Sequence, residues 1–317
     1  PIARHLHKVI GLGSVKHLIG FCSSVLAYKY FLKNYSLLSY DLLYSYWFSE
    51  GTKALVDLKK DKTIKVISRA HRYDIYEGFP DTPIFWPFRR NVLGKIDQVF
   101  SISENGKAFM ESRYEIFDKI TVSKLGVFDK GKLAPSTHEG EVNFVSVSRI
   151  DPMKRVQLIA DSIVSFAKKH PDVMVSWVHF GDGKNRQEIK SSIPILDNLS
   201  VVMVGIVPNW KIYDYYETFP LSVFLNLSSS EGIPVSIMEA QSFGIPVIAT
   251  DVGGNGEIID EETGKLLSSN PSVFDVNKAM ENILITNFSR EFIKKRWNTR
   301  FNAEINYKGF VKLLKNI

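Results

Sequence analysis

The sequence predicts an α/β protein made of two Rossmann-like lobes. Its 317 residues are long for a single hydrophobic core and suit two domains. Short apolar runs alternate with helical patterns from Asp41 onward, which is the order of elements in parallel α/β sheets. Between two such series lies a polar stretch, DKGKLAPSTHEG at 129–140. Its composition is that of a linker, and it marks the predicted domain boundary.

The first series, assigned to a lobe over residues 1–128, contains three predicted buried strands. They are DLLYSYW (41–47), IKVIS (64–68) and DQVFSIS (97–103). A helical pattern, ENGKAFMESRY at 104–114, follows the third strand directly.

The second series, assigned to a lobe over residues 129–300, has longer apolar runs. The predicted strands are VNFVSVS (142–148), VMVSWVHFG (173–181), LSVVMVG (199–205), SVFLNLS (222–228) and PVIAT (246–250). Near-continuous apolar runs are typical of parallel strands that are covered on both faces. An apolar stripe that includes Ile159 and Ile163 predicts a helix over 156–169. A C-terminal helix over 301–317 is expected to return toward the first lobe.

Composition limits the class of protein. Hydrophobic residues make up 44% and charged residues 23%, as in ordinary soluble globular proteins. The net charge of +6 fits an anionic substrate, an anionic membrane surface or a nucleic acid, and selects none of them. Cys22 is the single cysteine, so internal disulfides are excluded and a reducing cytoplasm is the expected compartment. The aromatic-rich stretch 18–48 is interrupted by charges, and we do not expect it to cross a membrane.

Several common motifs are missing or incomplete. Gly126 to Lys132 has the spacing of a phosphate-binding P-loop, but Leu133 stands where that motif requires Ser or Thr. There is no G-x-G-x-x-G of a dehydrogenase, and no Asp-x-Asp that would clamp a diphosphate through a metal. The seven histidines lack metal-ligand spacing, and basic and aromatic residues do not interleave as in a nucleic-acid module. We therefore expect neither a metal site nor a nucleic-acid partner.

The segment SRIDPMKR at 148–155 is a candidate anion site. A strand is predicted to end there, and the loop carries Arg149, Lys154 and Arg155 into the start of a helix. An anion at that point would meet two or three cations and the free N–H groups of the helix N-terminus. The alternative is a surface loop with ordinary basic residues.

Two glutamates, Glu231 and Glu239, lie eight positions apart on either side of Pro234. Proline is tolerated as the first residue of a helix and not inside one, so a helix is expected to start at Pro234. Glu231 is then in the loop before the helix and Glu239 on its second turn. We expect both carboxylates to face the same hollow from different elements.

All candidate loops follow strands of the second series. They are 148–154, 181–183, 228–234 and 251–256. In parallel α/β sheets ligands bind outside the carboxyl ends of the strands, so these loops are expected along one edge.

Four segments in this order and spacing resemble the large retaining glycosyltransferase family 4 of GT-B fold, within the glycosyl transferases group 1. They are SRIDPMKR, FGDGKNR (180–186), SSSEGIPVSIMEA (228–240) and FGIPVIATDVGG (243–254). EGIPVSIME is similar to the E-x7-E motif of that family. SRAHRYDIYE (68–77), DQVFSISE (97–104) and KLGV (124–127) also look like its first lobe, so the resemblance covers nearly the whole chain.

The resemblance implies a hexosyltransferase that takes a nucleotide sugar, UDP- or GDP-linked, and needs no metal or cofactor. The implied acceptor is a cell-surface polysaccharide or a glycolipid, and the mechanism is retaining. The implied catalytic residues are Glu231, which faces the transferred sugar, and His71 of the first lobe. The implied donor-binding residues are Arg149 and Lys154 on the diphosphate, Glu239 on the ribose, and Gly181, Gly183, Gly232, Ile233 and Pro234 around them.

The chain departs from the family pattern in two places. Arg72 follows the first-lobe histidine where a glycine is common, and this extra cation would favour an anionic acceptor. The first strands and the glycine-rich loop of the family should precede DLLYSYW by more than the forty residues present. We therefore expect that the chain lacks part of its N-terminal lobe.

The N-terminal segment mixes aromatic and basic residues. The aromatic ones are Phe21, Tyr28, Tyr30, Phe31, Tyr35 and Tyr40, and the basic ones are Arg4, Lys8, Lys16, Lys29 and Lys33. This mixture predicts peripheral, salt-sensitive attachment to anionic bilayers on the inner face of the membrane. The alternative is that these aromatic side chains form the core of the first lobe.

Other functions stay open at this point. Another GT-B enzyme that uses nucleotide sugars, such as an epimerase, would share the donor residues. A non-catalytic module that binds anionic surfaces is supported only by the net charge and some aromatic residues. A glycosidase would also use two carboxylates, but the resemblance assigns one of these two to the ribose.

Overall fold

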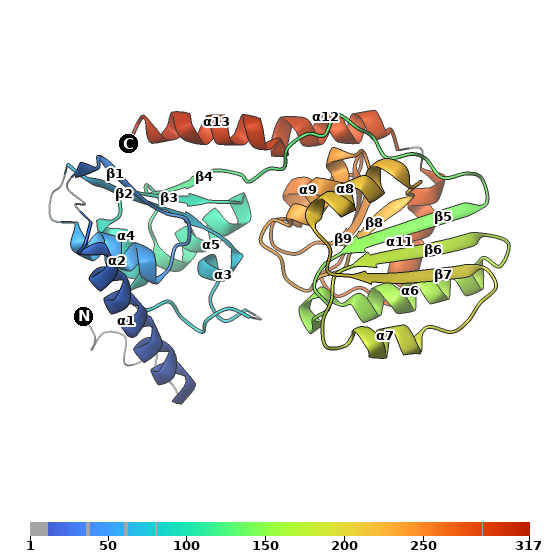
Figure 1. The fold of residues 1–317 in the computed structure, drawn as a ribbon, viewed down its shortest axis with the longest axis horizontal. Helices are drawn as coiled ribbons and strands as arrows, with labels where there is room; N and C mark the ends of the chain where they lie inside the picture. The colour runs from blue at the N-terminus through green and yellow to red at the C-terminus, as the bar shows by residue number, and fades with distance from the viewer. Residues whose placement is uncertain (1–11, 36–38, 60–62, 80, 287) are drawn as a thin grey trace. The chain divides into compact units, whose positions relative to one another are not determined.

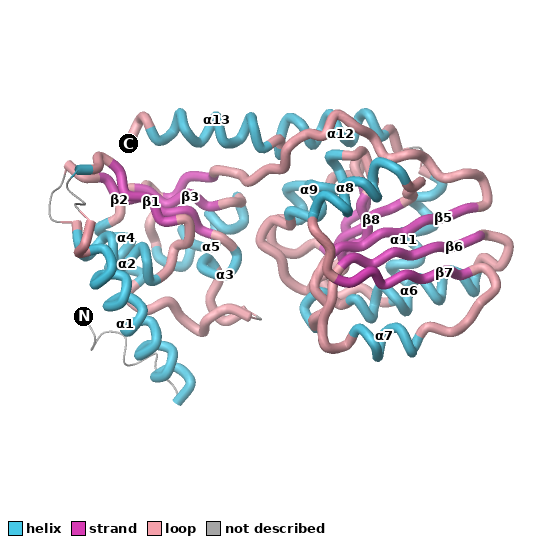
Figure 2. The backbone as a smooth tube through the Cα atoms, viewed as in Figure 1, coloured by secondary structure: helices cyan, strands magenta, loops and turns pink. Residues whose placement is uncertain are grey.

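The computed structural model describes residues 12–35, 39–59, 63–79, 81–286 and 288–317. The chain divides into two compact units. The first comprises residues 1–124 together with 309–317, and the second comprises residues 125–308. Figure 1 labels the elements of both units, and Figure 2 shows that each unit is a sheet with helices packed on it.

The first unit contains a four-stranded parallel sheet in the order β1-β2-β3-β4. Its strands are β1 (Leu42–Ser45), β2 (Lys65–Ala70), β3 (Gln98–Ser101) and β4 (Ile120–Val122). The three strands predicted for this lobe are confirmed. Strand β4 was missed, because its three residues are too few to show an apolar run.

Five helices cover this sheet. They are α1 (Leu12–Leu32), α2 (Glu50–Leu58), α3 (Arg72–Ile75), α4 (Arg89–Lys95) and α5 (Glu104–Tyr114). The predicted helix over 104–114 is confirmed, and the Ser103 hydroxyl caps it by accepting a hydrogen bond from the N–H of Gly106. Helix α1 was not predicted. It packs on α2, where Phe21 and Val25 are buried against Ala54 and Trp86.

The second unit contains a six-stranded parallel sheet in the order β10-β9-β8-β5-β6-β7. Its strands are β5 (Glu141–Val147), β6 (Met174–Phe180), β7 (Leu199–Gly205), β8 (Val223–Asn226), β9 (Val247–Thr250) and β10 (Gly264–Leu267). All five strands predicted for this lobe are confirmed. The order reverses between β5 and β8, and such a switch point is where doubly wound sheets bind ligands.

Helices cover both faces of this second sheet. They are the short η3 (Pro152–Lys154), then α6 (Val156–Lys169), α7 (Arg186–Ser192), α8 (Asn209–Thr218), α9 (Val235–Ser242), α10 (Asn255–Ile258), α11 (Val273–Ile285) and α12 (Arg290–Phe301). Helices α6 and α11 pack together on one face, and α9 and α12 on the other (Figure 1). The predicted stripe of α6 is in the core, since Ile159 and Ile163 are buried against the sheet.

The C-terminal helix is interrupted. The predicted continuous helix over 301–317 is wrong in this respect, because α12 ends at Phe301 and α13 (Ala303–Leu314) begins two residues later. Asn302 between them has an extended backbone conformation, which ends the first helix. In the first unit, Phe310 of α13 packs on Ile67 and Phe100 of the sheet. Among the described residues, no helix combines the length and the apolar character that crossing a bilayer requires.

Candidate functional site

The four candidate loops of the second unit lie together at the carboxyl ends of its strands. The N–H of Ser148 donates to the carbonyl of Phe180 at 3.0 Å, which joins the loop after β5 to the end of β6. The N–H of Ser229 donates to the carbonyl of Met153 at 2.8 Å, and that of Gly254 to Gly232 at 2.6 Å. The loops after β5, β6, β8 and β9 therefore form one continuous edge, as parallel pairing predicts.

Gly181 and Gly183 allow two of these loops to touch. Gly181 has a φ of +138°, which side chains rarely adopt, and a Cβ there would lie 1.8 Å from the carbonyl oxygen of Ser148. A Cβ on Gly183 would lie 2.0 Å from the carbonyl oxygen of Ile150. Both glycines thus fix the position of the predicted anion loop through backbone contact.

The cations of the anion loop have three different environments. Arg149 is 75% exposed and pairs with Asp151 at 3.1 Å, so its guanidinium is accessible to a ligand. Arg155 instead donates to the carbonyls of Leu227 at 2.5 Å and Ser228 at 2.8 Å. Because its donors are held by backbone, Arg155 braces the edge, and the expectation of a third anion-binding cation is not supported.

Lys154 contacts Glu231 directly. Its ammonium lies 2.6 Å from Glu231 Oε1, and the two side chains are only 17% and 8% exposed. The Asn226 side chain donates to the same oxygen at 3.3 Å. An ion pair withdrawn this far from water is a built feature, which argues against an ordinary surface loop.

Glu239 lies on the second turn of α9, whose N-cap is Pro234, as predicted. Its Oε1 accepts hydrogen bonds from Asn209 Nδ2 at 2.7 Å and from the Tyr213 hydroxyl at 3.0 Å. Burial raises the pKa of Glu239 above its ordinary value, against these two hydrogen bonds. Both bonds end on one carboxylate oxygen, so Oε2 is the atom left for a ligand.

Asn209 and Tyr213 are site residues that sequence reasoning missed. They lie four positions apart on α8, just after the carboxyl end of β7, and therefore share one face of that helix. This spacing of two polar residues beyond a predicted strand is the signal that would have found them.

The two glutamates do not contact the same groups. Glu231 lies in the loop before α9 with Lys154 and Asn226, and Glu239 lies on the helix with Asn209 and Tyr213. Between them, the N–H groups of Gly232 and Ile233 donate to no group in the described part of the chain. The carbonyl of Gly232 is held by Gly254, which orients this peptide segment.

His71 belongs to the first unit and follows β2. Its Nε2 lies 3.1 Å from the carbonyl oxygen of Tyr46, and since a carbonyl only accepts, Nε2 carries the proton. Burial, together with the nearby charge of Arg69, lowers the pKa of His71 to about 4, so the imidazole is neutral at pH 7. The rings of Tyr46 and Trp47 lie 4.7 Å and 4.4 Å from it.

Asp74 holds the His71 loop in place. Its carboxylate accepts from the N–H of His71 at 2.5 Å and from that of Phe48 at 2.7 Å. The backbone after β1 and the backbone after β2 are thereby tied to one side chain. Burial raises the pKa of Asp74 to about 7, while the Arg89 charge and the hydrogen bonds oppose that rise.

In the described residues, no three His, Cys, Asp or Glu side chains gather in a way that could hold a metal ion. The positive charges nearest the candidate donor site are those of Lys154 and Arg149.

Comparison with known proteins places the chain in a family. Residues 132–300, which are more than half of the chain, match the glycosyl transferases group 1. The chain is 26% identical over 197 residues to a phosphatidylinositol N-acetylglucosaminyltransferase of Arabidopsis thaliana, a match that covers 60% of this chain and 42% of that protein. It is 32% identical over 114 residues to the O-antigen biosynthesis glycosyltransferase WbnH of Escherichia coli, covering 36% and 30%. The chain thus spans less than half the length of these curated relatives.

Solved structures share the architecture. The lipopolysaccharide outer core galactosyltransferase WaaB in its apo form superposes with a TM-score of 0.71 at 17% identity, covering 95% of this chain and 82% of that one. The sucrose-phosphate synthase of Thermosynechococcus elongatus gives 0.70 at 19% identity, covering 92% and 76%. At these identities the likeness establishes the fold alone. The chain has the GT-B fold and belongs to the glycosyl transferases group 1 family.

Proposed function

We propose that this protein is a retaining glycosyltransferase of family 4 that moves a hexose from a UDP- or GDP-sugar to a cell-surface polysaccharide or glycolipid, without a metal or other cofactor. The observation that carries the proposal is the Lys154–Glu231 pair, which lies on the same edge as the buried Glu239 cluster. This edge offers cations for a diphosphate and a carboxylate for a ribose diol within a family member. The names of the matched relatives, in glycolipid and O-antigen synthesis, support the choice of acceptor.

The donor would be held by charge and by hydrogen bonds. Arg149 is exposed and Lys154 follows it in the same loop, so a diphosphate would be neutralised by both in place of a metal. Glu239 Oε2 would accept from a ribose hydroxyl, because Oε1 is already engaged. The free N–H groups of Gly232 and Ile233 would donate to the β-phosphate or the sugar.

The reaction would replace one bond at the anomeric carbon by another on the same face. The bond from this carbon to the phosphate oxygen breaks as the bond to the acceptor oxygen forms. The acceptor proton passes to the departing phosphate oxygen. In this scheme Glu231 orients the sugar while Lys154 stabilises the charge that develops on the phosphate.

Helix α1 supports peripheral attachment to a membrane, with one correction. Phe21 is buried in the core of the first unit and is unavailable, whereas Ile19, Leu26 and Tyr30 are 63%, 66% and 77% exposed. Lys29 is paired with Asp57 at 2.6 Å, and the predicted Arg4 and Lys8 lie outside the described residues. The exposed apolar side chains would insert, and Lys16 and Lys33 would meet anionic head groups on the cytoplasmic face.

A thermal-shift series tests the donor. Purified protein would be heated with UDP, GDP, their nucleosides and their sugars, each with and without EDTA. A ligand at a hundredfold excess over its Kd should stabilise by about 2.7 kcal/mol. The diphosphates of one base should stabilise the protein, its nucleoside should stabilise it less, and EDTA should have no effect. If no nucleotide stabilises the protein, the proposal is wrong.

Two outcomes favour the alternatives. Epimerisation or hydrolysis of the donor without an acceptor would indicate another GT-B nucleotide-sugar enzyme. Steeply salt-dependent binding to anionic surfaces, with no protection by nucleotides, would indicate a non-catalytic module. Retention is read from the anomeric configuration of the product, by NMR, with the complete natural protein.

A further inference from the structure

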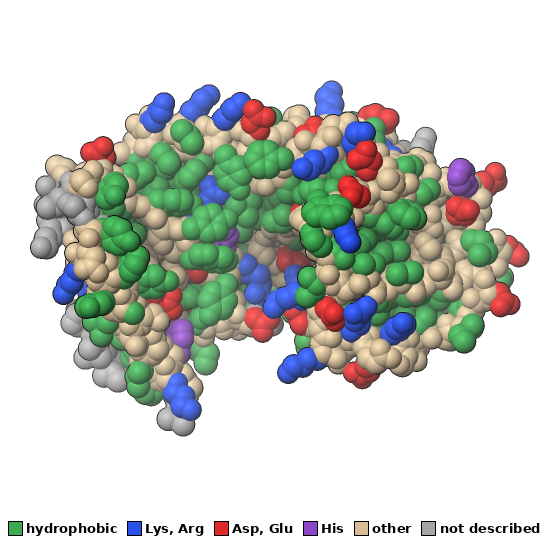
Figure 3. All heavy atoms as spheres, in the orientation of Figure 1, with side chains coloured by type: hydrophobic (Ala, Val, Ile, Leu, Met, Phe, Trp, Pro, Cys, Tyr) green, Lys and Arg blue, Asp and Glu red, His purple; other side chains and the backbone are tan. Residues whose placement is uncertain are grey.

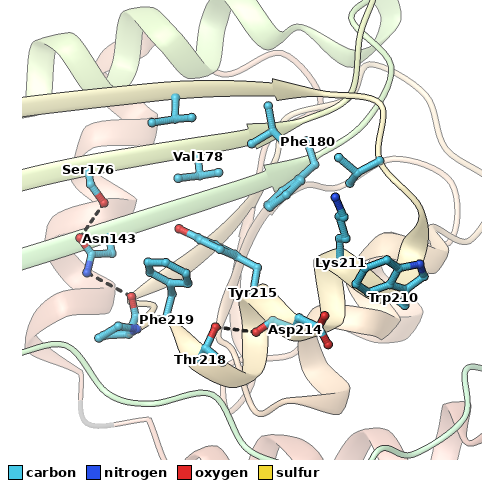
Figure 4. A pocket seen from close by; sticks show the side chains of 14 residues that line it. Asn143, Ser176, Val178, Phe180, Trp210, Lys211, Asp214, Tyr215, Thr218 and Phe219 are labelled. Carbon is cyan, nitrogen blue, oxygen red and sulfur yellow. Dashed lines mark hydrogen bonds between the residues drawn. The ribbon is translucent and has the colours of Figure 1, made fainter.

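The second unit carries a groove that the proposed reaction does not use. It lies between α8 and the strands β5, β6 and β7 and has a volume of about 730 Å³ (Figure 4). This is the size of a small-molecule site. Figure 3 shows hydrophobic side chains gathered over the strands on this face of the unit.

Helix α8 separates the groove from the candidate donor site. Asn209 and Tyr213 on one side of the helix donate to Glu239. Lys211, Tyr215 and Phe219, which follow at intervals of four residues, line the groove instead (Figure 4). A ligand in the groove would therefore not contact the glutamates.

The lining favours an apolar ligand. Val178 and Phe180 of β6 and Val202 and Val204 of β7 form one wall. The 49% exposure of Val202 and the 38% exposure of Val204 show that the protein leaves this wall uncovered. Apolar surface gathered in a concave site gains free energy when a ligand removes it from water.

The polar groups at the inner end of the groove are already paired. Ser176 donates to Asn143 at 2.6 Å, and Asn143 donates to the carbonyl of Pro220 at 3.1 Å. Thr218 donates to the carbonyl of Asp214 at 2.6 Å. A sugar or a nucleotide would leave its hydroxyl groups without partners here, so the lining disfavours both.

One cation stands at the opposite end. Lys211 makes no ion pair with any described residue, and Figure 4 shows its side chain on the face of α8 that points to the strands. Its ammonium lies 5.5 Å from the ring centroid of Trp210, which is 58% exposed. A negative group placed at this end of the groove would gain a charge-assisted hydrogen bond.

We propose that this groove binds a single-chain amphiphile with an anionic head, such as a fatty acid or an alkyl phosphate. The alkyl chain lies along Val178, Val202 and Phe219, and the head group contacts Lys211. The site belongs to the second unit alone and does not depend on the transferase activity. Because the ligand binds only folded protein, it also stabilises this unit.

Calorimetric titration below the critical micelle concentration tests the proposal. Dodecyl phosphate should bind with one site per chain, and each CH2 from octyl to dodecyl should tighten binding by about fourfold until the groove is full. Dodecyltrimethylammonium, with the same chain and a positive head, should bind at least tenfold more weakly. Inorganic phosphate should not bind. Equal affinity for the two head groups would overturn the proposal.

Two variants locate the site, each with a matched control. Lys211→Glu should weaken dodecyl phosphate by tenfold or more, whereas Lys190→Glu on α7 should not. Val202→Asp should abolish binding, whereas Ile195→Asp, at a fully exposed position, should not. Circular dichroism checks the folding of each variant, and Lys211→Glu remains decisive if Val202→Asp unfolds. Unchanged binding by folded Lys211→Glu would overturn the proposal, because it would place the amphiphile elsewhere, for example on α1.

Discussion

The ammonium of Lys154 lies 2.6 Å from the carboxylate of Glu231, so two charges with separate proposed tasks neutralise each other in the ligand-free chain. The pair keeps both charges stable at low exposure until a ligand arrives. A diphosphate near Lys154 would then compete with Glu231 for the ammonium, which frees the carboxylate to accept from a sugar hydroxyl.

Removal of a cation from the anion loop should weaken nucleoside-diphosphate binding. Arg149→Ala should raise the Kd for UDP or GDP by about tenfold, because one charge-assisted hydrogen bond is lost. Lys154→Ala should do the same and should also destabilise the fold, since Glu231 is left buried and unpaired. Calorimetry with nucleoside and diphosphate makes the comparison. Equal weakening of both ligands would contradict the assignment.

The two glutamates should differ in what they affect. Glu239→Gln should chiefly weaken UDP or GDP binding, since a ribose acceptor is lost. Glu231→Gln should leave nucleotide affinity nearly intact and lower turnover by the complete enzyme. Calorimetry gives the first quantity and a donor-consumption assay the second. The reverse pattern would show that the two roles are exchanged.

Alanine at Gly183 should displace the anion loop. Its Cβ would lie 2.0 Å from the carbonyl oxygen of Ile150, so the backbone has to move. We expect a loss of about 1–3 kcal/mol in the free energy of unfolding and weaker diphosphate binding. Gly309→Ala is the control, because nothing lies within 4 Å of its added Cβ. Urea unfolding of both variants makes the measurement, and an unchanged Gly183→Ala would contradict the close packing.

His71 should make the fold weaker in acid. Its pKa is lowered to about 4 by burial, against an ordinary value of 6.5, so the unfolded chain binds the proton more tightly. The stability is complete above pH 6.5 and is lost as the pH falls toward 4. Between pH 7 and 4.5 this amounts to about 2–3 kcal/mol. His71→Gln should reduce the pH dependence of urea unfolding by that amount. Identical pH profiles of the two proteins would refute the shift.

Membrane attachment should depend on the exposed face of α1. The complete natural protein should float with anionic liposomes at low salt, and far less with neutral liposomes or at high salt. Leu26→Asp should reduce the bound fraction about tenfold, because insertion of a leucine side chain is lost. Phe274→Asp, at a residue 72% exposed on α11, is the control. Binding that ignores lipid charge and salt would remove the membrane proposal.

Much of the fold was predictable because its strands are locally marked. The run LSVVMVG has the bounds of β7, and ENGKAFMESRY those of α5, since apolar runs and a serine cap are local signals. Helix α1 was missed because apolar residues lie on both its faces, so no stripe appears in the sequence. Strand β10, with four residues and one buried position, also lacks a readable pattern.

The sequence by itself determined which loops carry the candidate site. Apolar runs mark the strands, Pro234 marks the start of α9, and parallel strands bring their carboxyl ends to one edge. It placed Glu231 in a loop and Glu239 on a helix, and it identified the family.

Only the tertiary structure decided which of these groups meet. Lys154 and Glu231 are 77 positions apart, and Asn209 and Glu239 are 30 apart, so no local pattern links them. It also turned Arg155 into a brace, which its place beside Lys154 does not reveal. The physical reason is that local patterns fix the elements, whereas the partner of a charge depends on strand order and on which faces the helices cover.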